Sequence, residues 1–206
     1  MRFDAIHIVG AGGHGRVVAD ALVVGGVNAA RLVPRDGRAG LALQGVAVTT
    51  PETGPDMAGA AFHVAVGSAT IRSRLYASAV TAGALPLTVV HPAAIVAFDA
   101  ALGDGSFVAA GAVVAPLART GVAAIINHGA VVDHDVVIGD FCHIAPNATL
   151  GGEVRIGDRV LIGSGAVVLP GVRIADDVTV GAGAVVIADI GEAGIWVGNP
   201  ARRLGE

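Results

Sequence analysis

Aliphatic residues recur at every sixth position between Val90 and Gly191, without a single insertion. The first position of each six-residue unit is aliphatic except at Thr120, and the fifth position is small or aliphatic from Ala94 to Ile190. A period of six matches neither an amphipathic α-helix, with about 3.6 residues per turn, nor a plain hairpin sheet. The pattern therefore predicts short strands separated by a corner in every unit.

This repeat resembles the hexapeptide repeat of the left-handed parallel β-helix, in which three units form one triangular coil. In that fold the first and fifth positions point into the coil, and glycines relieve the corners. The 102 residues from 90 to 191 make seventeen units, which predicts between five and six coils. We expect the β-helix domain to span residues 89–206, including a short C-terminal tail.

Residues 1–88 follow a different pattern, in which short apolar runs alternate with helical spacing. Residues 6–9 are an apolar run, and residues 16–24 carry apolar side chains at helical intervals. Residues 62–66 and 69–82 repeat this succession of strand and helix. We therefore predict an α/β, Rossmann-like domain. Its length is about half of a doubly wound dinucleotide fold, so it fits one nucleotide better than NAD.

The loop after the first predicted strand is rich in glycine. Gly10, Gly12 and Gly15 satisfy the G-x-G-x-x-G spacing, which lets backbone amides at a helix N-terminus approach a phosphate. A glycine turn that only reverses the chain has the same composition. Ligands bind such sheets at the carboxyl ends of parallel strands, where Gly67 also lies.

Composition narrows the class of protein. The hydrophobic share is 53% and the mean hydropathy is +0.71, but the uncharged run over residues 77–98 contains Gly83, Pro86 and Pro92, which interrupt any membrane-spanning helix. Residues 1–10 lack a secretory signal, which predicts a cytoplasmic protein without membrane insertion. We assign the apolar excess to the coil interior and to subunit contacts, and expect a homotrimer.

The charged residues and the cysteine exclude further chemistry. The net charge is −4 and all 13 basic residues are arginine, which argues against a nucleic-acid-binding protein and removes lysine as a Schiff base. The one cysteine, Cys142, occupies an inward position of the repeat. We expect it to pack in the core rather than act as a nucleophile.

Motifs along the whole chain resemble the bacterial sugar O- and N-acyltransferases of the sialic acid and bacillosamine type. They are G-A-G-G-H-G at residues 10–15, A-V-G-S-A-T-I-R at 65–72, V-V-H-P-A-A at 89–94, the six-residue units, and W-V-G-N-P-A-R at 196–202. The resemblance implies that the N-terminal domain holds a nucleotide-linked amino sugar. It also implies that acetyl-CoA lies in a cleft between neighbouring coils.

The resemblance implies a set of substrate-binding residues in the N-terminal domain. Contacts to the nucleotide diphosphate are expected at Gly12, Gly13, His14 and Gly67. The family's second strand ends in an acidic pair, whereas this chain has Arg35 and Asp36 at those places. We take both residues as candidates for contacting the substrate. Because they differ from the family's acidic pair, the base or the ribose need not be recognised as it is in the family.

Polar side chains interrupt the outward positions of the middle coils at Asn127-His128, at Asp133-His134-Asp135 and at His143. Acetyl transfer needs a base for the proton of the nucleophile and a donor that polarises the thioester carbonyl. The family's strand reads acidic-His-acidic, which implies His134 as the base and Asp135 or Asp133 as the group that orients it and raises its basicity. Without the resemblance, a solvated surface histidine is the simpler interpretation of His134.

The resemblance implies that His143 hydrogen-bonds the acetyl carbonyl, with an interface histidine as the alternative. Asn127 is a candidate contact to the sugar, or an outward corner residue that tolerates left-handed backbone. Contacts to acetyl-CoA are expected from backbone groups at positions that match Gly152, Ser164 and Ala182. We predict no metal site.

These residues predict an enzyme that moves acetyl from acetyl-CoA to an amino group of a nucleotide-linked amino sugar, by direct attack, in bacterial surface glycan biosynthesis. The alternative within the family is O-acetylation of sialic acid or a related sugar. Two other classes are a non-catalytic nucleotide-sensing scaffold and a zinc carbonic anhydrase-like trimer, which needs a histidine pair five residues apart that this chain lacks. His134 and His143 are about half a coil apart, so we expect them to meet across subunits.

Overall fold

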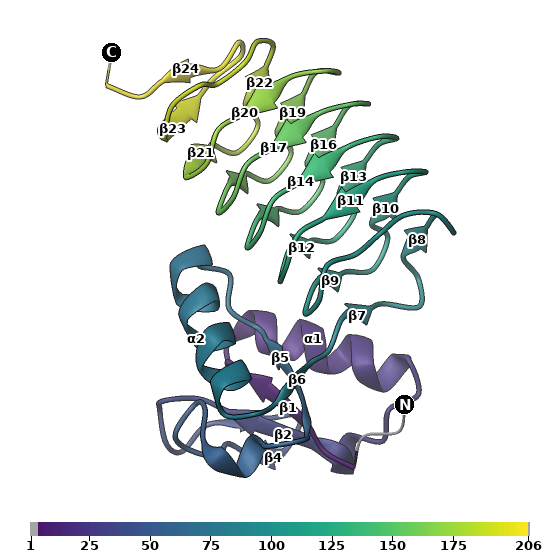
Figure 1. Ribbon diagram of the computed structural model, residues 1–206, viewed down its shortest axis with the longest axis vertical. Helices are drawn as coiled ribbons and strands as arrows, with labels where there is room; N and C mark the ends of the chain where they lie inside the picture. The colour runs from purple at the N-terminus through teal and green to yellow at the C-terminus, as the bar shows by residue number, and fades with distance from the viewer. Residues whose placement is uncertain (1–3, 206) are drawn as a thin grey trace. The chain divides into compact units, whose positions relative to one another are not determined.

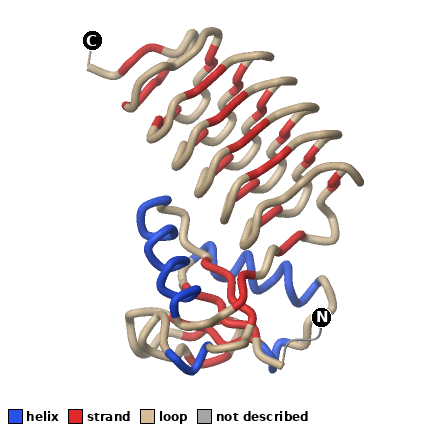
Figure 2. Tube along the Cα trace, in the orientation of Figure 1, coloured by secondary structure: helices blue, strands red, loops and turns tan. Residues whose placement is uncertain are grey.

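The computed structural model describes residues 4–205 and divides into two compact units, Met1–Pro92 and Ala93–Glu206. The sequence placed the division after residue 88. Figure 1 labels the elements of each unit, and Figure 2 distinguishes helix from strand.

The N-terminal unit is built on a parallel four-stranded sheet with two α-helices (Figure 1). These elements are β1 (Ile6–Val9), α1 (Gly13–Val24), β2 (Leu32–Arg35), β5 (Ala61–Val64), α2 (Ala69–Thr81) and β6 (Leu85–Pro86). The strand order is β2-β1-β5-β6, with β1 parallel to both β2 and β5. The smaller elements are η1 (Ala29–Arg31), β3 (Ala42–Leu43), β4 (Val46–Ala47), η2 (Pro55–Met57) and β7 (Val89–Val90).

The central strands of this sheet are buried on both faces, as expected for strands in a parallel sheet. Every residue of β1 and β5 is buried. One cluster of the core consists of Val9, Met57, Phe62, Val64, Leu75, Ala79 and Ala84. The predicted strand over residues 6–9 is confirmed at its bounds, and the later strand and helix are found with ends shifted by one or two residues.

Helix α1 begins at Gly13, three residues before the predicted start, so His14 and Gly15 belong to its first turn. Gly12 is the N-cap and has extended backbone. A side chain on Gly15 would collide with the backbone carbonyl of Gly10, which explains why the helix can approach β1 so closely. The glycines therefore set the packing of helix on strand, in addition to any role toward a ligand.

The C-terminal unit is a left-handed parallel β-helix with three faces (Figure 1, Figure 2). The first face carries β8 (Ile95–Val96), β10 (Val113–Val114), β13 (Val131–Val132), β16 (Thr149–Leu150), β19 (Val167–Val168) and β22 (Val185–Val186). The second face carries β11 (Arg119–Thr120), β14 (Val137–Ile138), β17 (Arg155–Ile156) and β20 (Arg173–Ile174). The third face carries β9 (Phe107–Val108), β12 (Ile125–Ile126), β15 (His143–Ile144), β18 (Leu161–Ile162), β21 (Val178–Val180), β23 (Gly194–Val197) and the antiparallel β24 (Arg202–Arg203).

Except for β21, which pairs with β23 at a separation of sixteen residues, parallel strands on each face pair with the strand eighteen residues later, as with Ile126 and Ile144. First positions from Val108 to Val186 and fifth positions from Ser106 to Ile190 are all buried, which confirms the inward assignment. Cys142 is fully buried among them. The assignment is wrong at Val90, which is 41% exposed.

The polar exception in the repeat has internal partners. Thr120 Oγ1 accepts a hydrogen bond from the Gly103 backbone at 3.1 Å and lies 3.4 Å from Ser106 Oγ. Ser106 Oγ also donates to the Gly121 carbonyl at 3.2 Å. Two inward hydroxyls are therefore satisfied without solvent, as buried polar groups require.

Among residues 4–205, no helix combines the length and the apolar character needed to cross a membrane.

Candidate active site

A histidine and a carboxylate meet at the corner between the first and second faces of the β-helix. His134 lies between β13 and β14, and its Nδ1 is 3.0 Å from Asp135 Oδ2. Asp133 Oδ1 accepts a hydrogen bond from the His134 backbone at 2.7 Å, and Asp135 has a left-handed backbone with φ of 59°. The corner therefore fixes the backbone on both sides of the histidine, while its side chain remains 55% exposed.

The electrostatics at this corner favour a basic imidazole. The hydrogen bond to Asp135 raises the pKa of His134, and the negative charge of Asp133 raises it further. Because a carboxylate accepts at Nδ1, neutral His134 keeps its proton on Nδ1 and leaves Nε2 as the acceptor. The arrangement can accept a proton from a bound nucleophile at Nε2.

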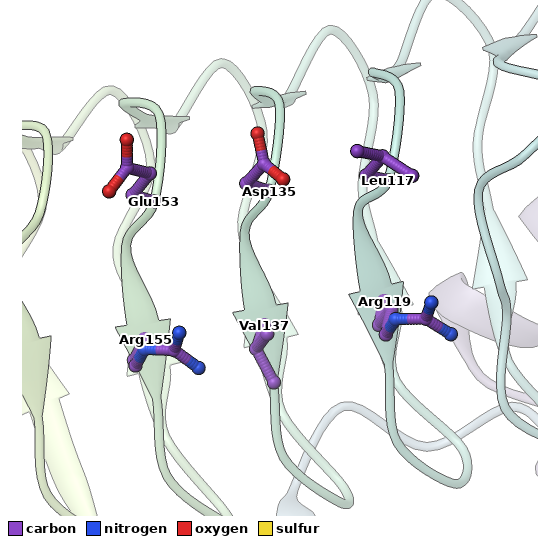
Figure 3. Close-up of a pocket in the computed structure, with 6 residues that line it drawn as sticks. All are labelled: Leu117, Arg119, Asp135, Val137, Glu153 and Arg155. Atoms are coloured by element: carbon purple, nitrogen blue, oxygen red, sulfur yellow. The ribbon is translucent and has the colours of Figure 1, made fainter.

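Two hollows adjoin this corner. A cavity of about 370 Å³ is lined by Asp133, His134, Gly152, Glu153, Pro170 and Gly171. A second, of about 420 Å³, lies on the second face and is lined by Leu117, Arg119, Asp135, Val137, Glu153 and Arg155. Figure 3 shows the carboxylates of Asp135 and Glu153 on successive coils, with Arg119 and Arg155 on either side of Val137. His134 thus lies beside space that a ligand can enter.

On the third face, His143 pairs with Asn127. The two residues lie on neighbouring coils, and Asn127 Nδ2 is 3.0 Å from His143 Nε2. Asn127 Oδ1 accepts from the His128 backbone at 2.9 Å, which orients the amide with its NH₂ toward the imidazole. An amide NH₂ only donates, so Nε2 of His143 accepts and the proton of the neutral ring is on Nδ1.

The predicted donor-binding residues lie on two different corners of one chain. Gly152 is directly after His134 in the stack of coils, since the Glu153 amide donates to the His134 carbonyl at 3.0 Å. Ser164 and Ala182 instead lie on the corner between the third and first faces, where the Gly183 amide donates to the Ser164 carbonyl. One chain brings together His134 with Gly152, and Asn127 with His143, but it does not unite these groups.

The N-terminal unit has its own cavity, of about 420 Å³, at the carboxyl ends of β1, β2 and β5. Its lining residues are Gly10, Asp36, Gly37, Arg38, Glu52, Val66, Ile71, Arg74 and Leu75. Asp36 Oδ2 accepts from the Ala11 amide at 3.0 Å, which ties β2 to the glycine loop. Hydrogen bonding by Arg38 lowers the pKa of Asp36. The cavity therefore combines two carboxylates, two guanidinium groups and a glycine loop.

The other predicted substrate residues differ in their placement. Arg35 is buried: its Nε donates to His7 Nδ1 at 3.0 Å, and it also hydrogen-bonds Asp56 and the Pro51 carbonyl. Its guanidinium serves the interior and does not line the cavity. Gly12 and Gly13, by contrast, have open space where a side chain would project.

Sequence reasoning missed Arg38, Glu52 and Arg74 as residues of the cavity. A signal existed for Arg38, because it follows Asp36 and Gly37 directly after a strand, where turns carry ligand-binding groups. Gly67 and His14 do not line the cavity. The Gly67 carbonyl accepts a hydrogen bond from the buried Arg72 at 2.8 Å.

Within residues 4–205, no group of three or more His, Cys, Asp or Glu side chains is arranged to hold a metal ion.

The profile described as bacterial transferase hexapeptide (six repeats) matches residues 153–188. No curated protein sequence matches the chain significantly. The acetyltransferase domain of PglB from Neisseria gonorrhoeae is 35% identical with a TM-score of 0.92, and the alignment covers 98% of this chain and 100% of that domain. That domain has also been solved in complex with acetyl coenzyme A.

Two further solved structures cover nearly the whole chain. Perosamine N-acetyltransferase from Caulobacter crescentus, solved with CoA and GDP-perosamine and with one histidine replaced by asparagine, is 35% identical with a TM-score of 0.93. The alignment covers 98% of this chain and 97% of that one. WeeI from Acinetobacter baumannii is 25% identical with a TM-score of 0.79, over 97% of this chain and 99% of that one.

Proposed function

Because this chain belongs to the bacterial sugar acyltransferases built on hexapeptide repeats, we propose that it transfers acetyl from acetyl-CoA to an amino group of a nucleotide-linked amino sugar. Membership rests on 35% identity to relatives of this family over nearly the whole of both chains. The chain is thus an acyltransferase. We place the reaction in the cytoplasm, as a step of bacterial surface glycan biosynthesis.

The observation that carries the proposal is the pairing of His134 with Asp135 at 3.0 Å beside an open cavity. His134 Nε2 takes a proton from the acceptor amine while the nitrogen attacks the thioester carbonyl. Asp135 holds the ring through Nδ1 and stabilises the imidazolium that forms. The tetrahedral intermediate then collapses and the C–S bond breaks. The His134 imidazolium returns its proton to the sulfur, and CoA leaves as the thiol. No covalent acyl-enzyme is required.

The charges around His134 favour an amine over a hydroxyl as the acceptor. Asp133, Asp135 and Glu153 all contribute negative potential at the imidazole. Such a potential attracts the ammonium group that an amino sugar carries near neutral pH, which must lose one proton before its nitrogen attacks, and it offers no comparable attraction to a hydroxyl. The perosamine N-acetyltransferase named above acts on an amino sugar, which fits this preference. O-acetylation of sialic acid or a related sugar is the second candidate.

We assign polarisation of the acetyl carbonyl to His143. Nε2 of His143 accepts from Asn127, which places the proton of the neutral ring on Nδ1. In this proposal Asn127 fixes the tautomer of His143, in place of the direct contact to sugar expected from the sequence. A donor aimed at the developing oxyanion is typically worth about 10²-fold or more in rate.

His143 and His134 lie on different sides of one chain. We therefore propose a homotrimer in which His134 of one subunit faces His143 of its neighbour. Acetyl-CoA then lies between subunits, with Gly152 on one side and Ser164 and Ala182 on the other. Co-expressing His134→Ala with His143→Ala tests this arrangement, because random mixing leaves about a quarter of the interfaces with both native histidines. Verified mixed trimers that are no more active than either parent would contradict the shared site.

We propose that the N-terminal unit is a Rossmann-like domain that binds the nucleotide of the acceptor. The cavity at the carboxyl ends of β1, β2 and β5 supports this, because open α/β sheets bind ligands there. Asp36 is suited to accept hydrogen bonds from ribose hydroxyls, and Arg38 and Arg74 are suited to phosphate. The amides at Gly12, Gly13 and His14 begin helix α1 and favour an anion.

A thiol-release assay tests the function as a whole. The enzyme would be given acetyl-CoA with UDP-, GDP- or dTDP-linked amino sugars, and with the matching hydroxy sugars as controls. Release of CoA thiol that depends on one amino sugar, with little turnover of its hydroxy counterpart, is the expected result. Faster turnover of a hydroxy sugar would favour O-acetylation, and no turnover above hydrolysis with any acceptor would favour a scaffold.

A further inference from the structure

The side-chain position of one glycine of the β-helix, Gly152, faces the His134 imidazole. A Cβ atom placed on Gly152 would lie 2.6 Å from both Cε1 and Nε2 of His134 and 3.2 Å from its Cδ2. These three nearest atoms all belong to the imidazole. Contacts under about 3 Å are not tolerated between carbon atoms, so an alanine here and the observed ring position exclude each other.

The position of Gly152 in the stack of coils explains this proximity. Residues eighteen apart share a corner, and the column at this corner contains Pro116, His134, Gly152 and Pro170. Successive coils are tied by hydrogen bonds from Asp135 to the Pro116 carbonyl and from Gly171 to the Gly152 carbonyl. Gly152 is thus the one member of this column with no side chain, and the imidazole lies over it.

We infer that Gly152 is a positioning residue. Because it has no side chain, it leaves a space, here called the seat, in which the His134 imidazole can lie while it hydrogen-bonds Asp135. The inference deepens the proposed function, on which it rests, by adding a residue that acts on the base through shape. It differs from the backbone contact to acetyl-CoA expected from the sequence, because alanine keeps the same amide and carbonyl. Gly152→Ala therefore separates the two roles.

Conformational strain does not complicate the substitution. Gly152 is not among the residues with positive φ, so alanine suits the backbone. The atoms in the way are the end of a side chain that is 55% exposed, which can rotate into solvent. We expect the ring to leave its seat and to lose its 3.0 Å hydrogen bond to Asp135 while the coil stays intact.

The primary test is an NMR titration of the His134 imidazole, combined with kinetics, in Gly152→Ala. We expect the pKa of His134 to fall, as we also expect in Asp135→Asn, and the acidic limb of kcat/KM to move to lower pH. The value of kcat should drop roughly 10- to 100-fold, less than the full contribution of a general base, because the imidazole is displaced and not removed. The KM for acetyl-CoA should change little. Gly191→Ala is the matched control, because a side chain at Gly191 meets open space on the same unit.

A second measurement covers the case in which Gly152→Ala folds poorly. The double variant His134→Ala, Gly152→Ala lacks the ring, so its Tm should equal that of His134→Ala, and its residual activity should match as well. An unchanged His134 pKa in Gly152→Ala, or an equal loss of Tm with and without the ring, would overturn the inference. If His134→Ala stays active, the base assignment fails, but the titration still decides whether Gly152 seats the ring.

Discussion

The two units of the molecule place their histidines in contrasting environments. In the N-terminal unit His7 and His63 are buried, and burial lowers the pKa of both, that of His63 to about 4. In the β-helix His134 is exposed, and the hydrogen bond to Asp135 raises its pKa. A neutral buried imidazole serves the structure, whereas an exposed imidazole beside a carboxylate can exchange protons with a substrate.

The units also differ in how they bring distant residues together. The N-terminal unit uses side-chain hydrogen bonds across the sheet, such as Asp36 to the Ala11 amide and Arg35 to His7. The β-helix uses a repeating backbone ladder, which stacks residues eighteen apart without specific side chains. These differences match the proposed functions of the two units. We propose that the N-terminal unit binds the nucleotide through specific side chains, and that side chains on the regular coils of the β-helix carry out acetyl transfer.

The largest expected effect comes from removing His134, the proposed general base on the β-helix. His134→Ala should lower kcat by roughly 10²- to 10⁴-fold, the usual contribution of general-base catalysis. Because the side chain is exposed on a corner, Tm and acetyl-CoA binding, measured by calorimetry, should stay near the parent values. Retention of more than about half of the activity would remove His134 from the mechanism.

A buried histidine of the N-terminal unit should affect stability instead. His63 is buried, its Nδ1 donates to the Leu87 carbonyl at 3.0 Å, and its pKa is about 4 against an ordinary value of 6.5. As pH falls from about 6.5 to 4 the unfolded chain binds a proton that the folded chain refuses, so the free energy of unfolding drops, by roughly 3 kcal/mol.

His63→Asn isolates this contribution, because the amide NH₂ can still donate to Leu87 while the titration is lost. Chemical denaturation at pH 7, 6, 5 and 4.5 should show a shallower loss of stability in the variant. Part of the slope should remain, since burial also lowers the pKa of His7. Parallel curves for parent and variant would show that His63 does not carry the effect.

Because we propose that the N-terminal unit binds the nucleotide, a substitution in the glycine loop should impair binding of the sugar nucleotide and not of acetyl-CoA. Gly13→Val places a side chain in open space at the first turn of α1, where we propose that amides approach the diphosphate. KM for the sugar nucleotide should rise about 10-fold or more, and KM for acetyl-CoA should stay nearly constant. Gly13→Ala should show a smaller rise, and equal damage to both substrates would point to misfolding instead.

The smallest expected change concerns the partner of the base. In the proposed mechanism His134 must be neutral to accept a proton, so we expect activity to fall as pH drops through its raised pKa. Asp135→Asn removes the anion, lowers that pKa, and should move the acidic limb of kcat/KM to lower pH with a modest loss of kcat at high pH. Asp133→Asn should shift the limb less, because Asp133 contributes charge without bonding to the ring. If the acidic limb of kcat/KM lies at the same pH in the parent, Asp135→Asn and Asp133→Asn, then the titration of His134 does not determine that limb.

Much of the fold was predictable because it rests on local repetition. The six-residue period identifies strands, corners and inward positions from Ser106 to Ile190, since each coil repeats the environment of the one before. The first strand and the glycine loop also follow from short-range pattern. The adjacency of His134 and Asp135 needed no fold at all, because the two are neighbours in the chain.

Contacts between distant residues depended on the tertiary structure. Arg35 looked like a substrate residue at the end of a strand, but the fold buries it against His7 and Asp56. The amide of Asn127 meets His143 only because one coil returns the chain to the same face. Gly152 likewise meets the His134 ring after one full coil. The six-residue pattern was enough to predict the coils and the kinds of side chain on their surface. Which of these side chains touch was decided by the winding of the chain, because each coil brings together residues that are distant in the sequence and unrelated by any local pattern.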